Sequence, residues 1–80
     1  MGWFCYIVEC ADNTYYTGIT TDIERRISAH NAGKGAKYVK GRLPVHVVYT
    51  EECENRSDAS RRELEIKSLD RQEKIALISR

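Results

Sequence analysis

Runs of apolar residues along the chain predict three short strands. Residues 3–10 are aromatic and β-branched over one strand length, and residues 14–19 repeat this character after a polar turn at 11–13. A third run, residues 45–50, follows the single proline. The first two runs are near enough in sequence to form a hairpin.

The length of the hairpin loop decides which tyrosines of these strands share a face, because side chains alternate along a strand. A two-residue turn places Tyr6 and Tyr16 on opposite faces of the sheet. A three-residue loop, 11–13, places them on the same face, and Asn13 tolerates the left-handed backbone that such a loop needs. We expect the second arrangement.

A helix is predicted from Asp22, or from the preceding threonine, to about residue 31. Its apolar stripe is bordered by two polar side chains, Arg26 and His30, whereas Arg25 points to solvent. Arg26 either lays its methylene groups over the core with its charge in water, or it serves a functional site.

A second helix is predicted from residue 57 or 58 to about residue 69. Glu63 lies on its apolar face, where a carboxylate is costly unless it is paired, hydrogen-bonded or bound to a cation. Two structural explanations stay open beside a functional one. Ser60 and Glu63 fit a capping box if the helix begins later, and Lys67 can pair with Glu63 one turn on.

A short third helix is expected after Asp70, which can cap it, with residues 75–78 as its docking surface. The resulting order β-β-α-β-α-α predicts an α+β fold, a small sheet with helices packed on it. Eighty residues fit one domain spanning 1–80.

Charge is unevenly distributed, although the net charge is only +1. Residues 25–50 hold six basic residues and no acidic one, and 33–42 reads as a basic loop punctuated by glycine. A segment of one sign is typical of a protein that binds a phosphate-rich partner, but also of a solvated loop. The candidate phosphate-binding residues of this loop are Lys34, Lys37, Lys40 and Arg42.

Composition excludes several classes of protein. Charged residues make up 31% of the chain, and no apolar run approaches the ~20 residues that span a bilayer. The N-terminus lacks the basic region of a signal peptide, so a cytoplasmic location is expected. Three cysteines without a C-x-x-C spacing disfavour a disulfide framework, and also a zinc site completed by His30 or His46.

Four motifs in register resemble the GIY-YIG endonuclease domain, and together they cover essentially the whole chain. They are Phe4-Cys5-Tyr6, Tyr16-Thr17-Gly18, the stretch from Asp22 through Arg26 and His30 to Asn31, and Arg62-Glu63-x-x-Ile66-Lys67. The stretch from Tyr16 to Arg26 resembles the free-standing, uncharacterised UPF0213-like members more narrowly.

The resemblance implies a three-stranded antiparallel sheet flanked by helices, and phosphodiester hydrolysis with one divalent metal, Mg²⁺ or Mn²⁺. It implies that Tyr6 or Tyr16 helps to activate water, that Arg26 holds the scissile phosphate and that Glu63 anchors the metal. His30 matches a position near the active site. An unperturbed phenol is a weak base at neutral pH, so Tyr6 needs the charges of an assembled site.

The expected partner is nucleic acid, most of all DNA, branched or single-stranded, with the basic loop tracking its phosphates. In larger relatives an attached domain or a protein partner selects the target. Many relatives also carry a late active-site asparagine, and none follows Lys67 here. Two other functions therefore stay open: a nucleic-acid-binding module without turnover, and a domain whose basic loop meets an acidic protein.

Overall fold

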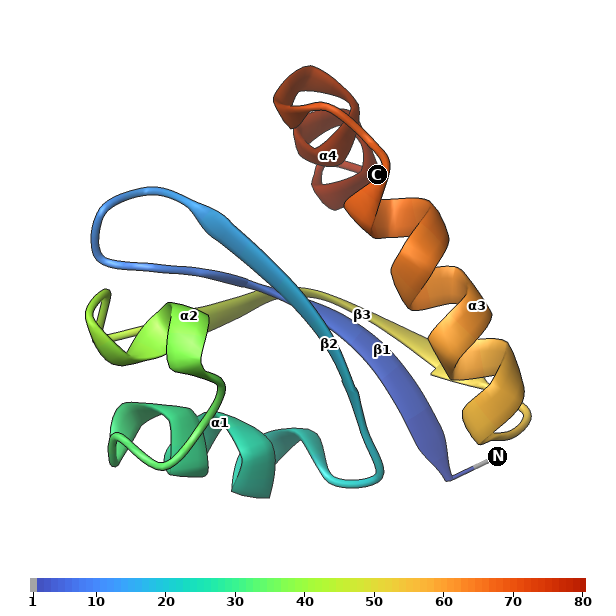
Figure 1. The fold of residues 1–80 in the computed structure, drawn as a ribbon. Coiled ribbons are helices and arrows are strands. Elements are labelled where there is room, and N and C mark those ends of the chain that lie inside the picture. The colour runs from blue at the N-terminus through green and yellow to red at the C-terminus, as the bar shows by residue number, and fades with distance from the viewer. Residues whose placement is uncertain (1) are drawn as a thin grey trace.

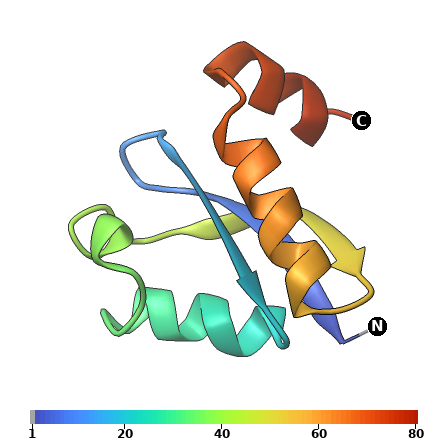
Figure 2. The ribbon, with the colours of Figure 1, turned by 45° about the vertical axis from the view of Figure 1, so that its right-hand side comes forward.

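The computed structural model describes residues 2–80, which form an antiparallel three-stranded sheet with helices on both faces (Figures 1 and 2). Strand order β2-β1-β3 places β1 in the centre. This α+β fold confirms the predicted class. The elements in chain order are β1 (Trp3–Glu9), β2 (Tyr15–Thr20), α1 (Ile23–Asn31), α2 (Lys37–Lys40), β3 (His46–Cys53), α3 (Arg56–Lys67) and α4 (Arg71–Ile78).

The β1–β2 hairpin has the register that the three-residue loop predicts. Tyr6 pairs with Gly18 and Val8 pairs with Tyr16, so the phenols of Tyr6 and Tyr16 lie on one face. Asn13 takes a φ of 67°, and its N–H donates to the Cys10 carbonyl over 2.9 Å. A left-handed asparagine therefore sets the register that brings the two tyrosines together.

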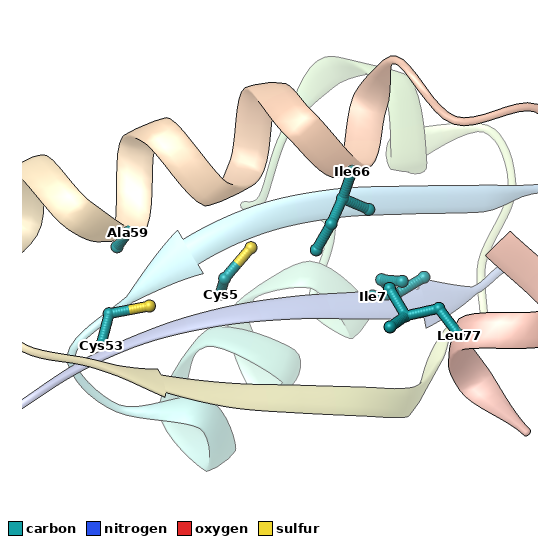
Figure 3. Packing of buried hydrophobic residues seen from close by; sticks show 6 residues of the cluster. All are labelled: Cys5, Ile7, Cys53, Ala59, Ile66 and Leu77. Atoms are coloured by element: carbon teal, nitrogen blue, oxygen red, sulfur yellow. The ribbon is translucent and has the colours of Figure 1, made fainter. Parts of the chain in front are cut away.

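Two separate cores lie on the two faces of the sheet. Side chains of β1 alternate between them: Cys5 and Ile7 enter the core beneath α3 and α4 (Figure 3), and Tyr6 and Val8 enter the core beneath α1 and α2. The first core is completed by Cys53, Ala59, Ile66 and Leu77, and the second by Cys10, Val39 and Val45. None of the three cysteines forms a disulfide.

The helix ends follow their capping residues. Asp22 caps α1 by accepting from the Arg25 N–H over 3.1 Å, as predicted. The predicted start of α3 was wrong, because Asn55 caps this helix by accepting from the Asp58 N–H over 2.8 Å. Glu63 thus lies inside α3 and forms no capping box with Ser60.

Two other expectations are corrected. The segment 33–42 is not all loop, because Val39 is buried and α2 forms around it, which changes the element order to β-β-α-α-β-α-α. The third strand runs on to Cys53, since Glu51 within it accepts from Arg62 over 3.0 Å and Cys53 pairs with Trp3.

Helix α4 begins after Asp70, and a capping box joins this residue to Glu73. Leu77 is buried and Ile78 packs against the same core, as expected, but Ala76 is exposed because a single face of this helix meets the sheet. Within residues 2–80, no helix has the length and apolar character needed to cross a membrane.

Candidate active site

A buried contact between β1 and α1 forms the centre of the site. The hydroxyl of Tyr6 lies 2.8 Å from Nε2 of His30, and both side chains have no exposed surface. The direction of this hydrogen bond depends on the tautomer of His30: the phenol donates when Nδ1 carries the imidazole hydrogen, and the phenol oxygen accepts when Nε2 carries it. Nδ1 has no hydrogen-bond partner among the described residues, so packing holds the ring in place.

Arg26 lies one turn before His30 on α1 and acts electrostatically on both residues. Burial raises the pKa of Tyr6, while hydrogen bonding and positive charge from Arg26 oppose this rise. Burial lowers the pKa of His30, and the charge of Arg26 lowers it further. The site therefore holds a neutral imidazole beside a phenol whose anion is partly stabilised by a guanidinium.

Tyr16 extends the site along β2. Its ring meets the ring of His30 edge-on, with centroids 5.7 Å apart, and stacks on Tyr38 of α2 at 5.9 Å. The guanidinium of Arg42 lies over the Tyr38 ring, 4.1 Å from its centroid. An aromatic row thus leads from the buried imidazole to the surface.

Glu63 reaches the site from α3, on the other side of edge strand β2. Its carboxylate pairs with Lys67 at 3.1 Å, and Nζ of Lys67 lies 5.9 Å from the centroid of the Tyr16 ring. The Glu63 side chain is 20% exposed, and its charge raises the pKa of both Cys5 and Tyr6. The inward carboxylate has the expected lysine partner, and its charge also acts on the Tyr6 phenol.

All five candidate catalytic residues are brought into one neighbourhood. Tyr6, Tyr16, Arg26 and His30 lie on the α1 side of the sheet, and Glu63 joins them through Lys67. Sequence reasoning missed Tyr38, although an aromatic residue between Lys37 and Lys40 is typical of nucleic-acid-binding segments. It also gave no role to Lys67 beyond its pairing with Glu63.

The candidate phosphate-binding residues divide into two kinds. Lys34, Lys37 and Lys40 are exposed, and the last two flank the buried Val39 of α2. Arg42 is held within the fold, because it donates to the Asp12 carboxylate over 3.0 Å and to the Tyr38 carbonyl over 2.7 Å. Part of its charge is therefore neutralised by Asp12.

Gly35 gives the His30 ring its room. A methyl group at this position would overlap Nδ1 of His30 and come within 2.8 Å of its Cα. We expect Gly35→Ala to lower the free energy of unfolding by about 1–3 kcal/mol, measured by urea denaturation. Gly41→Ala is the matched control, because nothing lies within 4 Å of its added methyl. Equal stability of the two variants would contradict this packing.

The lowered pKa of His30 predicts a pH dependence of stability. The unfolded chain binds a proton at this residue more readily than the folded chain, so stability is complete above about pH 6.5 and falls as the pH decreases from there. Urea unfolding between about pH 7.5 and 5.5 should show a decline of up to ~1.4 kcal/mol per pH unit that His30→Gln removes. The decline should persist in His46→Gln, a change at an exposed position of β3. Its persistence in His30→Gln would contradict the assignment.

The donor set can be tested against the divalent metal that the sequence resemblance implies. Among residues 2–80, no three histidine, cysteine or acidic side chains cluster as a metal cage. One carboxylate, Glu63, is available together with phenol oxygens. This suits Mg²⁺ or Mn²⁺, hard cations that often bind one protein carboxylate and complete their shell with water and phosphate oxygens. The residues present therefore fit such an ion, provided that Lys67 releases Glu63.

Comparison with known proteins matches residues 2–76 to the GIY-YIG catalytic domain. The chain belongs to the GIY-YIG family, a superfamily of nucleases.

Several similar proteins are named UPF0213 proteins. One from Halobacterium salinarum is 56% identical over 72 residues, which cover 90% of this chain and 94% of the relative. Another, from Staphylococcus haemolyticus, is 56% identical over 75 residues, or 94% of this chain and 92% of the relative. The solution structure of a UPF0213 protein from Bacillus halodurans is similar with a TM-score of 0.63 and 47% identity, covering 99% of this chain and 84% of that one.

Proposed function

We propose that the chain is a divalent-metal-dependent endonuclease that hydrolyses phosphodiester bonds in DNA, with residues 1–80 as a single nuclease domain. The observation that carries the proposal is the buried 2.8 Å contact between the Tyr6 hydroxyl and Nε2 of His30. A hydroxyl that donates to a neutral imidazole can pass on its proton while it receives another, which is the property a general base needs.

Proton transfer is the first role of this pair. The attacking water gives its proton to the Tyr6 oxygen while Tyr6 gives its own proton to Nε2 of His30. Burial opposes a free phenolate, so the two transfers are best made together. The hydroxide forms its bond to phosphorus as the bond to the leaving oxygen breaks. The leaving oxygen takes a proton from solvent water, and the imidazolium returns its own proton to the hydroxide so formed when the site opens to solvent.

Charge stabilisation is the role of Arg26. The guanidinium presents donors in a plane that matches two phosphate oxygens, and it lies beside the phenol that receives the proton. Donors fixed before the reaction stabilise the charge that develops on the phosphoryl oxygens at little cost in reorganisation. Arg25, exposed on the neighbouring face of α1, has no such place.

Glu63 would hold the metal, and Lys67 would move away when it does so. A bound Mg²⁺ or Mn²⁺ supplies Lewis-acid stabilisation of the phosphate oxygens. The released ammonium of Lys67 would then face the phosphate backbone from α3. The exposed lysines 34, 37 and 40 supply affinity that is independent of base sequence and falls with salt.

The proposal is tested by incubating the pure protein with labelled flap, fork and single-stranded DNA, with Mn²⁺ or with a chelator. Cleavage of any of these substrates only with the metal is expected. Binding without cleavage of every substrate would contradict the enzyme and leave a nucleic-acid-binding module on the same scaffold.

A further inference from the structure

A groove of about 350 Å³ opens beside Tyr16, at the edge strand β2. It is built from β2, α2, α3 and α4, and its lining residues are Tyr15, Tyr16, Thr17, Tyr38, Lys67 and Lys74. Tyr16 is shared by the groove and the candidate active site, so the two adjoin each other.

The groove combines exposed aromatic surface with positive charge. Tyr38 is 41% exposed, and its ring is parallel to that of Tyr16 within 24°. Lys67 stands over the Tyr16 ring from α3, and Lys74 enters from α4. Within the described part of the chain, no acidic side chain forms an ion pair with Lys74. The groove therefore has an ammonium group that is free to bind an anion.

Helix α4, which carries Lys74, is fixed to the β1–β2 hairpin. Arg71 donates to the Asn13 carbonyl at the hairpin tip over 2.9 Å and lies 4.8 Å from the centroid of the Tyr15 ring. Lys74 stands one turn further on the same helix, so this contact holds its position relative to β2. The fold thus adds a cation from the C-terminal helix to a groove whose other lining residues come from β2, α2 and α3.

Stacking surface together with ammonium groups selects among the forms of nucleic acid. In a duplex the bases stack on one another, so their faces are not available for stacking on a protein side chain. In a single strand the bases are free to stack on tyrosine rings while lysines meet the phosphates. Tyrosine rings and lysines both line this groove, and a duplex would leave the tyrosine rings unused.

We infer that the groove binds single-stranded nucleic acid next to the scissile phosphate, with a base replacing the Arg42 guanidinium on the Tyr38 ring and Lys74 binding a phosphate. The inference rests on the proposed function for the direction in which the strand runs. It narrows the substrate class to nucleic acids with an unpaired strand beside the cut.

Fluorescence anisotropy in the presence of a chelator tests this without any cleavage. The probes are a labelled oligothymidylate of about 12 nucleotides and a blunt duplex of the same length. We expect tighter binding of the single strand. Tyr38→Leu should weaken single-strand binding about 5-fold or more, as expected for the loss of one stacked base. Lys74→Met should weaken it about 3- to 10-fold and reduce the salt slope by ~0.7.

Arg61→Met is the matched control, because Arg61 is an exposed cation on α3 that pairs with Asp58 and does not line the groove. Its single-strand affinity should stay within about twofold of wild type. Unchanged affinity in both groove variants, equal losses in Arg61→Met, or equal affinity for the two probes would overturn the inference.

The two proposals fail separately. Single-strand binding that depends on Tyr38 and Lys74, without metal-dependent cleavage, would support the binding groove and contradict the nuclease activity. Metal-dependent cleavage, with groove variants that bind like wild type, would support the nuclease activity and contradict the binding groove.

Discussion

Glu63→Gln is expected to reduce metal-dependent cleavage about 10³-fold or more, equivalent to ~4 kcal/mol of transition-state stabilisation. The amide keeps the size of the side chain but removes the charge that would hold a divalent cation. Lys67 loses its partner at 3.1 Å, but an i,i+4 pair on a helix is worth only a few tenths of a kcal/mol and Lys67 is half exposed to water, so folding should be little affected. Rates are compared at saturating Mn²⁺ on whichever substrate the wild-type protein cuts.

Glu65→Gln provides the control on the same helix. Glu65 pairs with Arg62 at 3.2 Å on the exposed side of α3, with its side chain 57% exposed. This variant should cleave within about twofold of wild type. A Glu63→Gln protein as active as Glu65→Gln would remove the metal ligand from the proposed mechanism. Binding of Mn²⁺, followed by electron paramagnetic resonance, should weaken in Glu63→Gln alone.

Tyr6→Phe should lower cleavage about 10²- to 10⁴-fold, the range for loss of a general base. The ring stays in its core, but Nε2 of His30 loses the hydroxyl at 2.8 Å. An unpaired buried acceptor costs about 1–3 kcal/mol, so a lower thermal midpoint is also expected. Single-turnover rates at a temperature well below that midpoint separate the chemical defect from the loss of stability.

The matched substitution for Tyr6→Phe is Tyr15→Phe on the opposite face of the sheet. Tyr15 packs against the core beneath α3 and α4, and its ring carries Arg71. We expect its cleavage rate to stay close to wild type, because the substitution keeps the ring that lines the groove and removes only the hydroxyl. A slow Tyr15→Phe protein with a fast Tyr6→Phe protein would show that the wrong face was assigned to the chemistry.

The hairpin shows how far sequence reasoning reaches. Alternation together with one left-handed asparagine was enough to predict that Tyr6 and Tyr16 share a face, and the register confirms it. The first helix was placed equally well, because Asp22 is the residue that caps it. These features depend on local rules whose determinants lie within a few residues.

The wrong predictions concern segments whose structure depends on contacts with residues distant in the sequence. Four residues, 37–40, become helical because Val39 finds a place in the core with Tyr6 and Val8, which no local pattern reports. The start of α3 was set two residues late because Asn55, Ser57 and Asp58 all have capping side chains. Where several neighbouring residues can each cap a helix, tertiary packing decides which one does.

The residues of the candidate site could be named from the family resemblance, whereas the residues that surround them could not. The motif residues carry the resemblance, so Tyr6, Arg26 and Glu63 could be named in advance. Tyr38 and Lys74 meet Tyr16 only through the packing of α2 and α4. A charge count placed the basic surface within residues 25–50, and the fold extends it to the last helix.

The central strand has a consequence for motion. Cys5, Tyr6, Ile7 and Val8 have no exposed surface, and alternate members belong to opposite cores. Amide groups in such a strand exchange with solvent only when the whole protein opens, so hydrogen exchange at Tyr6 should report global unfolding. Any local opening at the candidate site must then come from the elements around β1, while the backbone that carries the Tyr6 phenol stays among the most protected of the molecule.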